Sequence, residues 1–133
     1  MDSVQDRIDD ALALWRAKRR EGAFLLAIVA VVVRARQDFP RPMREGESFR
    51  RYIESIFPTR VSVEYRGRLW PIEDIFYTWF RCEIVHRAGL PVDVGLTEDT
   101  EPGELSVRAG GAPEYKLLVS PGWFHQLIGW AQA

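Results

Sequence analysis

The feature that most constrains the fold is an apolar run of eleven residues, Ala23–Val33, inside a chain of 133 residues. A helix needs about 20 apolar residues to cross a bilayer, so this run is too short to span one. The run is apolar on nearly every side, which is typical of a helix at the centre of a bundle or at a subunit interface. We therefore predict a helix over residues 23–38, ended by Pro40 and Pro42.

Four further segments have the spacing or the end signals of helices. Ser3 can cap a helix over about 3–20, which carries an apolar stripe at Val4, Ile8, Leu12 and Trp15. The other three helices are predicted over about 47–57, 71–88 and 121–131. Alternating side chains predict short strands within about 92–119, at Val92–Leu96, Glu104–Arg108 and Tyr115–Val119.

The fold class predicted from these segments is mainly α. It is a bundle of four to five helices with a small β-hairpin or meander inserted before the last helix. A short extended segment over residues 60–69, with a turn at Arg66-Gly67, is also expected. The length and the ordinary composition, 47% hydrophobic and 28% charged, predict a single domain over residues 1–133.

The cysteine content and the distribution of charge bear on the cellular location of the protein and on the ligands it can bind. Cys82 is the only cysteine, which excludes an intramolecular disulfide, and no basic-then-apolar leader precedes the first helix. We therefore expect a reduced, cytoplasmic protein without a membrane anchor. Residues 1–90 carry a net charge of +3 and residues 91–133 carry −4. Sixteen of the eighteen basic residues are arginine, whose planar fork suits phosphate and carboxylate, although such a bias can also reflect genome composition.

The helix predicted over 71–88 contains two polar groups on an apolar arc. At 100° per residue most of its circumference is apolar, yet Glu83 and His86 fall among the apolar side chains. A buried carboxylate must be paired or protonated, and Glu83 is spaced to contact either His86 or Arg87. The alternative is an exposed last turn with an ordinary surface pair between Glu83 and Arg87.

Arg81 and His86 are the candidate catalytic pair in this helix. Five positions separate them, which on an ideal helix corresponds to about 140° and about 7.5 Å. They can converge only if the helix end unwinds near Gly89 or if a second copy of the chain supplies the partner. An imidazole that moves protons and a guanidinium that stabilises a phosphate transition state could together cleave RNA without a metal. A structural arginine and a helix-capping histidine are the alternative.

Residues 77–91, YTWFRCEIVHRAGLP, resemble the signature of HEPN-domain proteins, in which four to six residues separate an arginine from a histidine near a helix end. The resemblance implies a helical bundle, a homodimer, and a metal-independent endoribonuclease site shared between two protomers, without a cofactor. Many members of that family act in toxin–antitoxin systems or in defence, so an antitoxin or partner protein is expected.

The resemblance assigns roles to individual residues. Arg81 and His86 match the catalytic arginine and histidine. Tyr77 would be an auxiliary phosphate contact, and Cys82 occupies the position where active members often carry Asn, Asp or His. Glu83, which is spaced to contact His86 or Arg87, is a further supporting candidate that the resemblance itself does not assign.

Other site chemistries have less support in the sequence. Cys82 and His86 have a spacing that can chelate zinc, with Glu83, Asp93 or His125 as further ligands, but no second Cys/His pair exists. Cys82 could also act as a nucleophile with His86, although a cysteine among aromatic residues is more often part of a core. We expect neither a metal nor a cofactor. Two functions remain: a homodimeric endoribonuclease, or a catalytically silent scaffold that binds RNA, a nucleotide or a partner protein.

Overall fold

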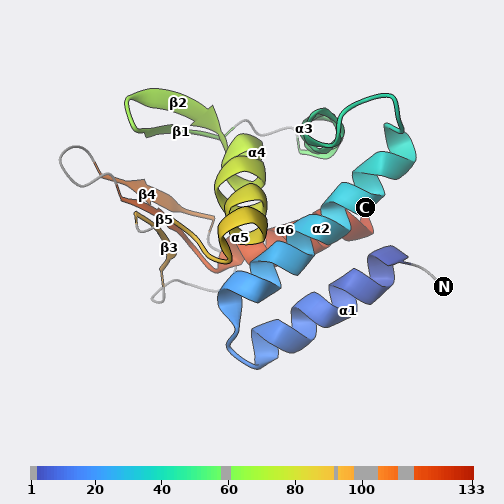
Figure 1. Cartoon of the computed structure of the whole chain (residues 1–133), viewed down its shortest axis with the longest axis horizontal. Coiled ribbons are helices and arrows are strands. Elements are labelled where there is room, and N and C mark those ends of the chain that lie inside the picture. The colour runs from blue at the N-terminus through green and yellow to red at the C-terminus, as the bar shows by residue number, and fades with distance from the viewer. Residues whose placement is uncertain (1–2, 58–60, 92, 98–104, 111–115) are drawn as a thin grey trace. The chain divides into compact units, whose positions relative to one another are not determined.

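The computed structural model describes residues 3–57, 61–91, 93–97, 105–110 and 116–133 (Figure 1). The chain divides into two compact units, Met1–Thr59 with Leu127–Ala133 (unit 1) and Arg60–Gln126 (unit 2). The described secondary structure is mainly α with two small sheets, which confirms the predicted class in this coarse form. None of the helices in the described part of the chain is long and apolar enough to cross a membrane. The single domain and the cytoplasmic location stay predictions.

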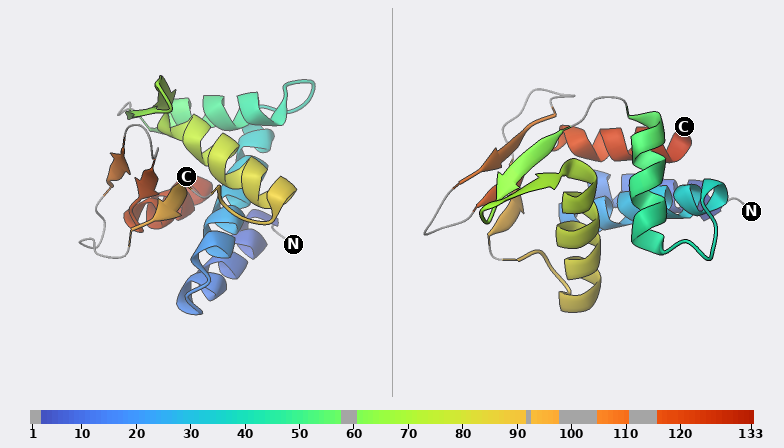
Figure 2. Two further views of the ribbon diagram at one scale, coloured as in Figure 1. Left: turned by 60° about the vertical axis from the view of Figure 1, so that its left-hand side comes forward. Right: turned by 90° about the horizontal axis from the view of Figure 1, so that it is seen from above.

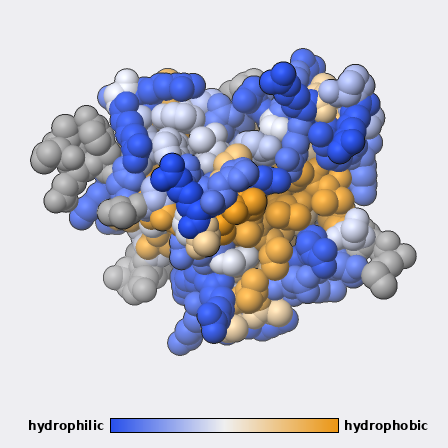
Figure 3. Space-filling view, in the orientation of Figure 1, coloured by the Kyte–Doolittle hydropathy of each residue, from blue (hydrophilic) through white to orange (hydrophobic). Residues whose placement is uncertain are grey.

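Unit 1 contains three long helices, α1 (Ser3–Arg16), α2 (Arg20–Asp38) and α3 (Glu45–Ile56). α1 packs along α2, and α2 packs against α3 (Figure 2). The apolar run predicted to form a central helix lies in α2, whose buried side chains are Ala23, Phe24, Ala27, Ile28, Ala30, Val31, Val32 and Ala35. Its half-buried apolar residues, Leu25, Leu26, Val29 and Val33, recur at helical spacing along one face. Apolar surface is visible over α2 in Figure 3.

The turn between α1 and α2 differs from the predicted helix over 3–20. α1 ends at Arg16 because Lys18 adopts a left-handed conformation with φ of 63°. The amides of Lys18 and Arg19 then donate to the carbonyls of Trp15 and Leu14, at 3.0 and 2.9 Å. This pairing is the Schellman motif, which glycine usually terminates. The predicted helix was too long because lysine at this position gave no stop signal, and α2 begins at Arg20 rather than Ala23.

A buried serine secures the corner between α2 and α3. Ser48 is fully buried and its hydroxyl donates to the carbonyl of Phe39 at 2.7 Å. The Nη1 of Arg36 donates to the same hydroxyl at 3.0 Å and also to the carbonyl of Met43. These bonds satisfy two carbonyls of the connecting loop, those of Phe39 and Met43, as is expected of buried polar groups.

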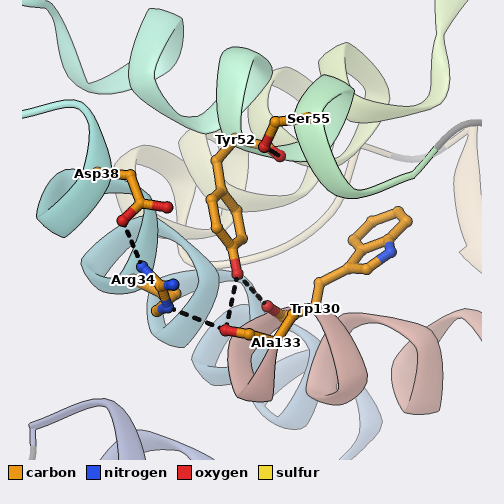
Figure 4. A network of polar contacts seen from close by, with 6 residues as sticks. All are labelled: Arg34, Asp38, Tyr52, Ser55, Trp130 and Ala133. Atoms are coloured by element: carbon orange, nitrogen blue, oxygen red, sulfur yellow. Dashed lines mark hydrogen bonds and ion pairs between the residues drawn. The ribbon is translucent and has the colours of Figure 1, made fainter.

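The last helix, α6 (Gly122–Gln132), contributes residues to both units. Its C-terminal half is tied to α3 within unit 1, where the Tyr52 hydroxyl donates to the carbonyl of Trp130 at 2.7 Å (Figure 4). The Nε of Arg34 donates to the carbonyl of Ala133 at 3.1 Å, and its Nη1 pairs with Asp38 at 2.9 Å (Figure 4). The position of α6 agrees with the helix predicted over 121–131.

Unit 2 contains two small sheets. β1 (Ser62–Tyr65) and β2 (Arg68–Pro71) form an antiparallel hairpin with the predicted turn at Arg66-Gly67. The second sheet has the order β3 (Val94–Leu96), β5 (Leu117–Val119), β4 (Val107–Ala109). β3 runs parallel to β5, so the predicted simple hairpin or meander is wrong in this detail. The parts of the predicted segments at residues 60, 92, 104 and 115 lie outside the described residues.

The helix predicted over 71–88 is not a regular α-helix. It consists of α4 (Ile72–Asp74), a π-helical stretch η1 (Ile75–Cys82) and α5 (Glu83–Arg87). In a π-helix each amide bonds five residues back, which widens the turn. The buried side chains accordingly recur at four and five positions, as Ile72, Ile75, Phe76 and Phe80 show. The angles calculated at 100° per residue therefore do not apply here.

Candidate functional site

The predicted catalytic residues lie at the end of this helical segment. Arg81 is half-buried in η1, and its guanidinium carbon lies 5.9 Å from the ring centre of Tyr77. Cys82, also half-buried, ends η1. His86 is exposed in α5, so its predicted place on an apolar arc is wrong because the π-helical turns change the register. Convergence of Arg81 and His86 across a homodimer stays a prediction.

Glu83 pairs with the arginine of its own helix. Its carboxylate lies 3.1 Å from the Nε of Arg87, whose side chain is 78% exposed. This is the surface pair given above as the alternative to a buried carboxylate, and such exposed pairs contribute about 0–1 kcal/mol. Within the described residues, no group of three His, Cys, Asp or Glu side chains is placed to hold a metal ion. Asp93, one of the further ligands considered, is instead occupied by the hairpin of unit 2, and His125 lies exposed on α6.

The tip of the β1–β2 hairpin is held by Asp93. Its Oδ2 accepts from the Tyr65 hydroxyl at 2.5 Å and from Arg66 Nη2 at 2.6 Å. Arg66 and Gly67 have φ values of 54° and 73°, the two positive angles of a type I′ turn. Arginine tolerates this conformation poorly, so the contacts to Asp93 offset a local strain of roughly 1–3 kcal/mol.

Two pKa values record the electrostatics of this tip. Burial, helped by the hydrogen bond to Asp93, raises the pKa of the Tyr65 hydroxyl to about 12. Burial by itself raises the pKa of the Asp93 carboxyl, but the hydrogen bonds from Tyr65 and Arg66 outweigh that effect and hold this pKa below its usual value. The carboxylate therefore stays ionised and the phenol stays neutral at neutral pH.

Cations and aromatic rings alternate from the tip of the hairpin onward. We call this set the ladder and define it by Tyr65, Arg66, Trp79, Trp70 and Arg68. The guanidinium of Arg66 lies 5.2 Å from the ring centre of Tyr65 and 4.9 Å from that of Trp79. Trp79 meets Trp70 edge to face at 5.6 Å, and the guanidinium of Arg68 lies 4.3 Å from the ring centre of Trp70. Significant cation–π pairs occur roughly once per 70–80 residues, so this part of unit 2 is unusually rich in them.

Unit 1 contains the densest positive charge of the chain, at the turn between α1 and α2. We call this turn the basic corner and define it by four cations, Arg16, Lys18, Arg19 and Arg20. Three of the four are exposed, and within the described residues none of them is in an ion pair. Figure 3 shows hydrophilic side chains over the end of unit 1 where α1 and α2 join.

Two features of the basic corner favour an anion. Arg20 stacks on Trp15 with its guanidinium carbon 4.7 Å from the ring centre, so its charge is held at the corner and no described carboxylate takes it up. Arg19 is the N-cap of α2, and among the described residues its side chain makes no capping hydrogen bond. The N-terminus of α2 by itself stabilises an anion by about 0.3–1 kcal/mol, while the C-terminus of α1 at the same turn favours the cations.

Comparison with known proteins identifies a family. A family model named Rv1289 matches residues 3–112. The chain belongs to the Rv1289 family. No curated protein and no solved structure is similar enough to match. The matching model is not a HEPN model, so the identification of residues 77–91 as a HEPN signature is wrong. An arginine and a histidine five positions apart occur often by chance, and the π-helical register removes the regular helix that the resemblance assumed.

Sequence reasoning missed both the ladder and the basic corner of this Rv1289-family protein. The helix predicted over about 3–20 places Lys18, Arg19 and Arg20 in its last turn, where cations are usual at a solvated helix end. The signal was nevertheless present as four cations within five residues, 16–20. The contacts of Arg66 had no comparable signal, since Asp93 lies 27 residues away in the sequence.

Proposed function

We propose that this Rv1289-family protein binds RNA and that the basic corner contacts the RNA phosphates. The observation that carries the proposal is the set of four cations that no described carboxylate neutralises. The charge of the units supports the same location, because unit 1 has a net charge of +2 and unit 2 has −3. Lysine and arginine that neutralise phosphates release counterions, and this release supplies most of sequence-independent affinity.

The proposal predicts a specific dependence on salt. For a single strand, the slope of log affinity against log salt is about −0.7 per neutralised phosphate. Four contacts give a slope of about −2.8, which corresponds to a loss of about 50-fold between 50 and 200 mM salt. The double variant Lys18→Asn/Arg19→Gln should halve the slope to about −1.4 and reduce this loss to about 7-fold. Asparagine is chosen because it tolerates the left-handed backbone at residue 18.

The measurement is fluorescence anisotropy with a labelled oligouridylate of about 12 nucleotides, within the usual site sizes for single strands. The matched control is Arg7→Gln/Arg51→Gln, which removes two exposed cations that are already paired with Asp10 at 2.8 Å and Glu47 at 3.4 Å. The control should keep the wild-type slope. Absence of RNA binding by the wild type, or equal slopes for the two double variants, would rule the proposal out.

Cleavage of the bound RNA by Arg81 and His86 is a second candidate function. Its support is that His86 is exposed and that Arg87, rather than His86, takes the carboxylate of Glu83. Arg81 is also positioned by the ring of Tyr77. The same RNA, incubated with a chelator, should yield cyclic phosphate ends, and His86→Ala should lower the rate by at least about 100-fold. Intact RNA, or equal rates for wild type and variant, would leave binding as the function.

A further inference from the structure

We infer that Arg68, which lies over Trp70 in the hairpin of unit 2, is a stacking site for an unpaired nucleobase. The inference rests on the proposed RNA binding and deepens it, because it makes single-stranded RNA the ligand. The site is defined by the guanidinium of Arg68 and the indole of Trp70, whose centres lie 4.3 Å apart.

The indole of Trp70, over which Arg68 lies, is held in place by contacts within the protein itself. The indole Nε1 of Trp70 donates to the carbonyl of Tyr65 at 3.1 Å, and its ring packs edge to face on Trp79 at 5.6 Å. Strand register places Tyr65 directly opposite Arg68 across the hairpin. The contact of Tyr65 with Asp93 secures that opposite strand. A base that stacks here therefore meets a pre-oriented surface and little ordering free energy opposes it.

The chemistry of Arg68 suits an unpaired nucleotide. Its side chain is exposed, and in the described part of the chain it is in no ion pair. Its guanidinium carbon lies 4.3 Å from the centre of the Trp70 ring. A base can stack on the side of the planar guanidinium that faces away from the indole, while the N–H edge donates to the adjacent phosphate. Every base has a π-face, so such a site tolerates any sequence. Bases within a duplex are already stacked on their neighbours and cannot enter it.

The net charge of unit 2 distinguishes binding at Arg68 from binding at the basic corner. Unit 2 has a net charge of −3, so it attracts RNA less over a distance than unit 1 does. Arg68→Lys keeps the charge that contacts the phosphate, so the part of the affinity that this substitution removes comes from stacking rather than from counterion release. Stacking of one base changes affinity by about 5- to 150-fold in comparable sites. The effect should therefore appear in the affinity at fixed salt and in the preference for single strands, while the salt slope stays the same.

The test uses Arg68→Lys, which keeps the charge and removes the planar fork. Labelled oligouridylate of about 12 nucleotides and an RNA duplex of the same length are titrated at one salt concentration. The wild type should prefer the single strand. Arg68→Lys should lower single-strand affinity by at least about 5-fold and leave duplex affinity unchanged. The control Arg108→Lys makes the same chemical change at an exposed residue of β4 and should change neither.

The outcomes distinguish this inference from the proposed function. If the wild type binds single strand and duplex equally, or if Arg68→Lys keeps the wild-type preference, the stacking site is refuted. RNA binding at the basic corner would then still stand, provided that Lys18→Asn/Arg19→Gln weakens binding in the same assay. If the wild type binds neither RNA, both ideas fail together.

Discussion

Replacing Tyr65 with phenylalanine should change how stability depends on pH above neutrality. Tyr65 is only 1% exposed, and its pKa is raised from 10.0 to about 12. The folded protein thus favours the neutral phenol, whereas the unfolded chain ionises it near pH 10. The associated stability is complete below pH 10 and is lost as the pH rises from 10 to 12. Two pKa units at 1.36 kcal/mol each give a loss of about 2.7 kcal/mol.

The variant should be less stable than wild type at neutral pH but should lack this alkaline loss. Tyr65→Phe removes the hydrogen bond to the ionised Asp93, and hydrogen bonds to charged groups contribute about 1.5–3 kcal/mol. Phenylalanine cannot ionise, so the wild-type advantage near pH 8 should shrink toward zero near pH 12. Tyr52, whose pKa burial also raises, titrates in both proteins and cancels from the comparison.

Urea unfolding followed by circular dichroism, at pH values from about 8 to 12, measures both effects. Tyr77→Phe serves as the control, because it removes a tyrosine from the same unit while Tyr65 remains. The control should show the full alkaline loss of the wild type. The assignment of Tyr65 as a buried, neutral donor would be refuted if Tyr65→Phe lost stability with pH as steeply as wild type.

Two further predictions concern unit 1. Ser48→Ala should lower the free energy of unfolding by about 1–3 kcal/mol, because it leaves the carbonyl of Phe39 and a nitrogen of Arg36 without the hydroxyl; a loss below about 0.5 kcal/mol in urea melts would contradict this account. Lys18→Gly should raise the free energy of unfolding by about 0.5–1 kcal/mol, since glycine adopts a φ of 63° without strain. The same variant should bind RNA more weakly, because it removes a cation of the basic corner. If stability and RNA affinity instead both rose or both fell, this would argue against separate roles of residue 18 in the turn and in RNA binding.

The elements that the sequence predicts well are those in which side-chain spacing matches regular geometry. Ala23–Val33 lies in α2, and the alternating residues before α6 do form strands. The end of α1 was missed because a lysine occupies the position that usually carries glycine. The parallel pairing of β3 with β5 joins segments about 20 residues apart, which no local pattern specifies.

Prediction of the candidate site is limited for the same reason, because it too relies on regular helix geometry. The positions of Arg81 and His86 were derived from regular α-helical turns, and the π-helical stretch Ile75–Cys82 alters those turns. Buried residues at intervals of four (Ile72, Phe76 and Phe80) and of five (Ile75 and Phe80) are present in the sequence, but this spacing is close to that of an ordinary helix. The pair of Glu83 with Arg87 could be predicted because both lie on one helix, whereas the pair of Arg66 with Asp93 could not.

The division of unit 1 between two stretches of chain has a consequence for its synthesis on the ribosome. α3 is complete once residue 56 has emerged, but the carbonyl that accepts from Tyr52 belongs to Trp130. The roughly 70 residues between these segments take on the order of 3 to 14 s to translate at about 5–20 residues per second. During that interval α2 and α3 lack their contacts with the end of the chain, so chaperones have time to act before unit 1 is complete.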